Sequence, residues 1–160
     1  METKEKVLEK INLLNTEFLC ININPEFADT RLFCEKYSFP MEKSCNTIIV
    51  ASKKEPKQFC ACVVLATTKL DVNKRVKKVM GVSRVSFAST YEMKQLTGME
   101  VGGVTVFSLP YDLPIYVDER IMELDWIILG GGGRDTKFKT SPQIFHELKA
   151  TTIENLAIRI

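Results

Sequence analysis

Two glycine clusters are the residues whose type and spacing point most directly to chemistry. Gly102 and Gly103 interrupt a β-branched stretch over residues 101–107, and four consecutive glycines occupy positions 130–133. A glycine pair weakens a strand, so it indicates a bulge or the close approach of a ligand. For residues 130–133 alone, a flexible turn is an equally good interpretation. We expect the two clusters to face one pocket, where backbone N–H groups would bind an anion or an oxyanion.

The other reactive side chains form no recognisable catalytic or metal-binding pattern. The single histidine, His146, lies in a predicted helix, and no Gly-x-Ser-x-Gly elbow accompanies it. Cys60 and Cys62 are two apart on a predicted strand and are interpreted as small buried residues, because two thiolates do not complete a zinc site. The glycines 130–133 fit neither a Walker loop nor a Rossmann fingerprint. We therefore expect no metal and no cofactor.

Length and composition bound the class of protein. The chain has 160 residues, 45% of them hydrophobic, and a net charge of +2, which predicts one domain with a real core and argues against a strongly cationic nucleic-acid binder. No apolar run is long enough to cross a bilayer, and the charged start of the chain does not resemble a signal peptide. The five scattered cysteines are expected to be reduced, which predicts a cytoplasmic protein.

A local basic cluster stands out against this balanced charge. It comprises Lys69, Lys74, Arg75, Lys77, Lys78 and Arg84, opposed only by Asp71. The default interpretation is the solvated face of a helix, and the alternative is a contact with nucleic-acid phosphates.

The elements that must position these residues follow from periodicity and capping patterns. Helices are predicted over residues 3–14, 29–37, 71–81 and 89–98, and from Ser141-Pro142 onward. Strands are predicted over residues 18–23, 47–51, 59–66, 101–107, 115–117 and 125–129. Strands outnumber helices and do not alternate regularly with them. We expect one α+β domain over residues 1–160, with helices packed on a mixed, mostly antiparallel sheet.

Five motifs in a fixed order carry a family resemblance. They are Asn46–Val50, Thr67–Lys74, Thr97–Thr105, Leu113–Asp118 and Gly130–Arg134. Together they resemble the YbaK/prolyl-tRNA-synthetase-associated, aminoacyl-tRNA editing domain from about residue 29 to residue 148. Each motif is weak alone, but five in this order are specific.

The resemblance implies a free-standing domain that hydrolyses the ester of a mischarged tRNA, such as alanyl- or cysteinyl-tRNA for proline. Water attacks the ester while backbone amides hold the oxyanion, with no metal and no covalent intermediate. The residues implied for catalysis are Asn46, Gly102 and Gly103. Those implied for substrate binding are Asp29, Thr30, Thr47, Met99, Val104, Gly131, Gly132 and Arg134. Lys74, Lys77 and Lys78 are the candidates for contacting tRNA phosphates.

Two positions depart from the family pattern. Asn46 stands where active deacylases of the family carry a lysine, and Val106 stands where the family usually has a proline. The alternative hypothesis is therefore a module that binds an amino acid, an aminoacyl-adenosine end or a protein partner without turnover. The sequence leaves open a homodimer or a synthetase partner. It also leaves open whether Lys43, Lys69 or Lys137 reaches the pocket in place of the family lysine.

Overall fold

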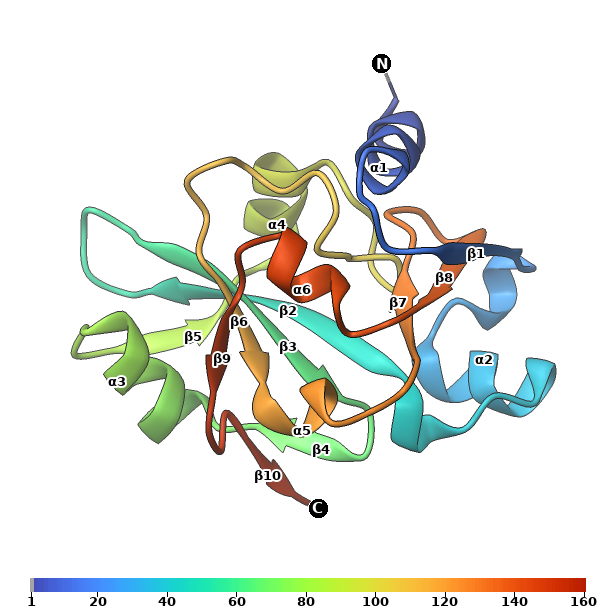
Figure 1. Cartoon of the computed structure of the whole chain (residues 1–160). Helices are drawn as coiled ribbons and strands as arrows, with labels where there is room; N and C mark the ends of the chain where they lie inside the picture. The colour runs from blue at the N-terminus through green and yellow to red at the C-terminus, as the bar shows by residue number, and fades with distance from the viewer. Residues whose placement is uncertain (1) are drawn as a thin grey trace.

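A computed structural model describes residues 2–160 and shows ten strands in three sheets with helices around them (Figure 1). The strands are β1 (Phe18–Asn22), β2 (Cys45–Ser52), β3 (Phe59–Leu65), β4 (Thr68–Leu70), β5 (Val85–Phe87), β6 (Ile115–Asp118), β7 (Ile127–Gly130), β8 (Thr136–Thr140), β9 (Thr151–Ile153) and β10 (Ala157–Arg159). The α-helices are α1 (Thr3–Asn12), α2 (Thr30–Tyr37), α3 (Lys77–Met80), α4 (Thr90–Thr97), α5 (Glu119–Met122) and α6 (Ile144–Glu147). Short helical turns are η1 (Pro25–Phe27), η2 (Met41–Lys43) and the π-helical η3 (Val72–Val76).

The sheets confirm the expected α+β class. The largest has the order β5-β2-β3-β6-β9, and smaller sheets are formed by β1-β8-β7 and by β10-β4. Pairing is antiparallel except between β3 and β6 and between β6 and β9. Over the three sheets together the pairing is therefore mixed and mostly antiparallel, as predicted from the sequence.

The five-stranded sheet separates two hydrophobic clusters. On one face, Ala61 and Val63 of β3 pack with buried side chains of α1 and α6. On the other face, Cys60, Cys62 and Val64 pack with buried residues of β4, η3 and the C-terminal segment. Alternation along β3 explains this division, because successive side chains of a strand point to opposite faces. Cys60 and Cys62 share one face and are buried, as the sequence predicts.

Strand β2 changes its neighbour along its length. Ser44, just before the strand, forms a parallel bridge with Ile128 of β7, and residues 50–52 at its far end pair with β5. Between these points, residues 46–48 pair with β3 on one side, and on the other side no strand among residues 2–160 pairs with them. The two larger sheets thus meet at the start of β2 and separate beyond it.

The predicted strand over residues 101–107 is wrong. The structure has turns there, and Val106 and Phe107 are buried in the hydrophobic core. The carbonyls of this segment bind to donors from residues 132–137 instead of pairing with a neighbouring strand. The β-branched composition predicted a strand because it indicates burial, and here burial occurs without strand pairing.

Several element ends also differ from the prediction. The first helix ends at Asn12 rather than residue 14, and the last begins at Ile144, after a turn at Ser141-Pro142. Strands β4, β5, β8, β9 and β10 were not predicted, because three to five residues carry little periodicity. The sequence Ser89-Thr90-Tyr91-Glu92 is typical of a capping box, and the structure confirms it at the start of α4. Gly81 and Gly98 end α3 and α4 in the left-handed conformation.

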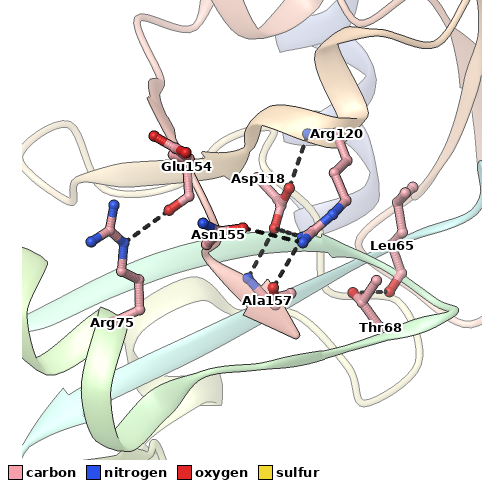
Figure 2. A network of polar contacts seen from close by, with 8 residues as sticks. All are labelled: Leu65, Thr68, Arg75, Asp118, Arg120, Glu154, Asn155 and Ala157. Atoms are coloured by element: carbon pink, nitrogen blue, oxygen red, sulfur yellow. Dashed lines mark hydrogen bonds and ion pairs between the residues drawn. The ribbon is translucent and has the colours of Figure 1, made fainter. Parts of the chain in front are cut away.

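The C-terminal segment is attached to the large sheet through a buried carboxylate (Figure 2). Asp118, only 1% exposed, accepts hydrogen bonds from the amide of Ala157 and from a guanidinium nitrogen of Arg120, each at 2.9 Å. The same guanidinium nitrogen donates to the carbonyl oxygen of Ala157 at 2.9 Å. Arg75 donates to the carbonyl oxygen of Glu154 from the other side of this segment. The side chains of Asp118 and Arg120 therefore fix β10 in place.

Replacement of Asp118 by alanine should lower the free energy of unfolding by about 3 kcal/mol, because it leaves buried donors without an acceptor. Chemical denaturation measures this loss. Glu35→Ala provides the control, because it removes an exposed ion pair with Arg31 on α2 and should cost less than about 0.5 kcal/mol. Equal losses for the two variants would contradict the assigned role of Asp118.

Candidate active site

A cavity of about 560 Å³ opens beside the free edge of β2. Its walls come from the start of α2, the first half of β2, the turn between β5 and α4, the loop over residues 101–104, the end of β7 and the start of β8. This volume falls in the range of ligand sites, roughly 300–1,000 Å³. The cavity therefore lies where the two larger sheets separate.

The site residues expected from the sequence divide into two groups. Those that line the cavity are Asp29, Thr30, Asn46, Thr47, Gly102 and Val104. Those absent from its walls are Gly103, Met99, Gly131, Gly132, Arg134, Lys74, Lys77 and Lys78. The first group lies on three separate segments of the chain, which only the fold brings together.

The two glycine clusters pack backbone against backbone. The amide of Gly132 donates to the carbonyl oxygen of Gly103 at 2.6 Å, and the amide of Glu100 donates to the carbonyl oxygen of Gly132 at 3.1 Å. A Cβ atom on Gly103 would lie 2.1 Å from the carbonyl oxygen of Gly133. This contact requires glycine, because a side chain does not fit between backbones at that distance.

Both clusters also reach the cavity. Gly102 and Gly130 line it, and a Cβ atom on Gly130 would lie 2.6 Å from the carbonyl oxygen of Val104. Gly102 has a φ of +88°, a left-handed conformation that glycine adopts without strain. The two clusters thus meet at one cavity, as expected from the sequence.

Three consecutive carbonyls of the loop over residues 101–103 are each bound by a donor from residues 132–137. The pairs are Arg134 Nη1 with Val101 at 2.7 Å, Lys137 Nζ with Gly102 at 3.1 Å, and the amide of Gly132 with Gly103 at 2.6 Å. Arg134 also donates to the carbonyl oxygen of Pro25 at 3.0 Å. The hydrogen bonds that these carbonyl oxygens accept therefore hold the loop in one conformation.

The amides of the same loop are used differently. The N–H of Gly103 donates to the carbonyl oxygen of Glu100 at 2.9 Å. The N–H groups of Gly102 and Val104 have no acceptor within residues 2–160. Both of these residues line the cavity, so the loop contributes two residues with unpaired backbone donors to its wall.

The wall formed by α2 and β2 carries hydroxyl and amide groups. The Thr30 hydroxyl donates to Asn46 Oδ1 at 2.6 Å, which ties the first turn of α2 to the start of β2. The Thr47 hydroxyl is buried with no partner within the described part of the chain. Asp29 lines the cavity, is exposed and forms no side-chain hydrogen bond to the start of α2, so its carboxylate remains available to a ligand.

The expected site residues outside the cavity have structural surroundings of their own. Met99 is 1% exposed and belongs to the hydrophobic core. Gly131 is buried, and a Cβ atom there would lie 2.6 Å from the carbonyl oxygen of Thr136. Gly132 and Arg134 line a second hollow, of about 530 Å³, beside the N-terminal residues.

Of the three lysines left open by the sequence, only Lys137 reaches the cavity. Lys43 forms an ion pair with Asp125 at 2.6 Å, and Lys69 lies on β4 in pairing with β10. On β8, Phe138 lies between Lys137 and Lys139, so Phe138 and Lys137 point to opposite faces of the strand. In the structure Lys137 is 5% exposed and Phe138 is 1% exposed, so both faces of β8 are covered.

Burial lowers the pKa of Lys137 from its usual value near 10.5 to about 8, because the charged ammonium loses hydration. Cys34 and Asp29 oppose this effect, and Arg134 adds to it. The sequence named Lys137 only as one of three candidate lysines, and it named Gly130 only as part of a glycine cluster. Cavity residues that it did not single out include Cys45, Thr90 and Met93.

The basic cluster is largely exposed. Lys74, Lys77 and Lys78 project from η3 and α3, which lie beside β5 (Figure 1). None of the three forms an ion pair within the described residues. Arg75 differs, because it is half-buried and binds the backbone of Glu154.

Within residues 2–160, no group of three or more His, Cys, Asp or Glu side chains has an arrangement suited to a metal ion. None of the helices in that range combines the length and apolar character needed to cross a bilayer.

A family model and a curated relative were found by comparison with known proteins. The aminoacyl-tRNA editing domain matches residues 24–148. The uncharacterized protein YwhH of Bacillus subtilis (strain 168) is 24% identical over 128 residues, which cover 74% of this chain and 80% of that protein.

Solved structures show the same fold. A candidate trans-editing enzyme for prolyl-tRNA synthetase superposes with a TM-score of 0.82 at 15% identity, covering 100% of this chain and 99% of that one. The hypothetical protein APE2540 gives a TM-score of 0.78 at 22% identity, covering 94% and 97% of the two chains.

Replacement of Gly103 by alanine should lower the free energy of unfolding by about 3 kcal/mol, because the methyl group would push the two glycine segments apart. Gly81→Ala is the control: its φ is +69° and no atom lies within 4 Å of the added Cβ. That variant carries backbone strain alone and should lose about 1 kcal/mol. Chemical denaturation of both variants measures the difference, and a smaller loss for Gly103→Ala would refute the packing argument.

Proposed function

The chain belongs to the aminoacyl-tRNA editing domain family, and on that basis we propose that it is a free-standing deacylase of mischarged tRNA. The observation that carries this proposal is the glycine loop, whose carbonyls are held from outside while the amides of Gly102 and Val104 remain unpaired at the cavity wall. Unpaired backbone donors fixed before the substrate arrives suit the developing negative charge of ester hydrolysis.

The proposed reaction is a direct attack by water. The water oxygen bonds to the ester carbonyl carbon, and its proton passes to the terminal ribose oxygen as the C–O ester bond breaks. The products are a free amino acid and an uncharged tRNA. The amides of Gly102 and Val104 would donate to the carbonyl oxygen as it becomes negative, and each such donor typically contributes about 2.7–4 kcal/mol to lowering the barrier.

Other cavity residues would position the substrate. We assign this role to Thr30, Asn46 and Thr47 on the wall formed by α2 and β2, and to Asp29, whose exposed carboxylate suits the α-ammonium group of the amino acid. Gly103, Gly131, Gly132 and Arg134 would act indirectly, by holding the loop. This changes the expectation for these four residues from substrate contact to support.

A second site of this kind answers a physical need. A synthetase discriminates one methylene by only about 1–3 kcal/mol, so a small wrong amino acid is attached at an appreciable rate. A separate hydrolytic cavity removes it. Alanyl- or cysteinyl-tRNA for proline are the first candidates, and the expected location is the cytoplasm, where charged tRNAs are used.

Wild type should hydrolyse at least one member of a panel of alanyl-, cysteinyl-, seryl- and prolyl-tRNAs. Gly102→Ala should lower kcat/KM at least about 100-fold, because a Cβ at φ +88° would also meet Arg134 Nη1 at 2.7 Å and shift the oxyanion donors. Gly81→Ala carries matched backbone strain away from the cavity and should retain activity.

The same panel separates deacylation from binding alone. If the wild-type protein hydrolyses none of these tRNAs and the Asn46→Lys variant hydrolyses one, the domain is a binding module that has lost turnover. If Gly102→Ala folds and hydrolyses as fast as wild type, the assignment of the oxyanion donors is wrong.

We also propose that Lys74, Lys77 and Lys78 contact tRNA phosphates. Lys74→Glu/Lys78→Glu should raise KM about tenfold with little change in kcat, and should flatten the slope of log KM against log salt by roughly 1–2. Lys6→Glu/Lys10→Glu on α1 is the matched control, with the same spacing and charge change on an exposed surface. Equal effects of the two pairs would indicate a general charge effect instead of a tRNA contact.

A further inference from the structure

Lys137 is an unusual residue in this fold because it is a buried cation without an acidic partner. Its side chain lies on β8, is 5% exposed, and forms no ion pair within residues 2–160. Lysine is rarely buried unless its charge is paired. Because no carboxylate neutralises this buried ammonium, its other contacts must stabilise it.

The side chain of Lys137 contacts the glycine loop at the cavity wall and a buried aromatic ring of α2. The ammonium nitrogen donates to the carbonyl oxygen of Gly102 at 3.1 Å and lies over the ring of Phe33, 5.6 Å from the centroid. Lys137 itself lines the cavity, as do Asn46 and Thr47 of β2. The cation–π contact with Phe33 offsets part of the lost hydration.

The hydrogen bond to Gly102 fixes one particular peptide group. Its oxygen is held by Lys137, and its nitrogen, which belongs to Gly103, donates to the carbonyl oxygen of Glu100 at 2.9 Å. A peptide group is planar, so bonds at both ends leave it no freedom to rotate. The unpaired amides of Gly102 and Val104 belong to the peptide groups immediately before and after it, whose oxygens are held by Arg134 and by the amide of Gly132. The group held by Lys137 is the link between these two peptide groups.

We propose that Lys137, as an ammonium ion, is the positioning residue of the reacting loop: it holds the Gly102–Gly103 peptide group so that the flanking amides are aimed into the cavity. The effect of Lys137 on turnover rests on the proposed deacylase function. The contact itself can be tested without that function.

The charge state of Lys137 then sets the pH range of activity. Burial brings its pKa to about 8, while Cys34 and Asp29 on α2 and its N-terminus favour the charged form and Arg134 disfavours it. Below this pH the ammonium donates a strong, charge-assisted hydrogen bond. As pH rises through about 8 the charge is lost, the hold on Gly102 weakens, and turnover should fall.

The contact is tested first by NMR titration of the whole protein from pH 6 to 10. The amide resonances of Gly102, Gly103 and Val104 should shift together with an apparent pKa near 8. Lys137→Met should abolish that shared transition, whereas Lys139→Met should retain it, because Lys139 lies on the same strand over Trp126 instead. Loop resonances that do not titrate in wild type would overturn the proposal, whatever the protein hydrolyses.

The consequence for turnover is tested with the tRNA that wild type hydrolyses, after subtraction of the uncatalysed rate. Lys137→Met should lower kcat/KM at least tenfold at pH 7, and Lys139→Met should not. Lys137→Arg should restore part of the activity and remove the alkaline decline near pH 8, because the arginine stays charged. An alkaline decline caused by the α-amino group of the substrate would persist in every variant, which separates it from Lys137.

The two measurements fail in different ways. If no charged tRNA is hydrolysed, the proposed function is wrong, and the NMR titration still decides whether Lys137 holds the loop. If wild type is active and Lys137→Met has the same rate and pH profile, the positioning role is wrong and the deacylase function stands.

Discussion

The arrangement of this domain depends on a direct contact between two stretches of backbone. The segments 100–104 and 130–133 approach so closely that the amide of Gly132 bonds to the carbonyl oxygen of Gly103 at 2.6 Å. No side chain fits between them, because a Cβ on Gly103 would lie 2.1 Å from the carbonyl oxygen of Gly133. Glycine at these positions therefore serves close packing, and the unpaired amides at the cavity wall are a consequence of that packing.

This contact works together with the sheet topology. Strand β2 leaves β7 near Ser44 and meets β5 only at residue 50, so the edge between them is open. The glycine loop closes the far side of the opening without filling it, since Gly102 and Gly130 contribute no side chains. The cavity thus results from a missing strand partner on one wall and missing side chains on the other.

Polar groups around the loop have separate structural and chemical roles. Arg134, Lys137 and the amide of Gly132 bind three consecutive carbonyls, while the amides of Gly102 and Val104 stay without acceptors within residues 2–160. Burying these carbonyl oxygens costs little free energy, because each accepts a hydrogen bond from the protein in place of one from water. It also fixes the directions of the free amides before any ligand binds, which is the requirement for stabilising a developing charge.

The sequence by itself determined the fold class, the capping of α4 by Ser89, and the importance of both glycine clusters, because these depend on local composition and short-range hydrogen bonds. It assigned residues 101–107 to a strand, since burial and strand pairing give the same local pattern. Only the tertiary structure decided that Gly103 packs while Gly102 lines the cavity, and that Lys137 is buried beside it. A residue's side chain can be assigned to a face from alternation, but which element covers that face depends on segments more than 30 residues away.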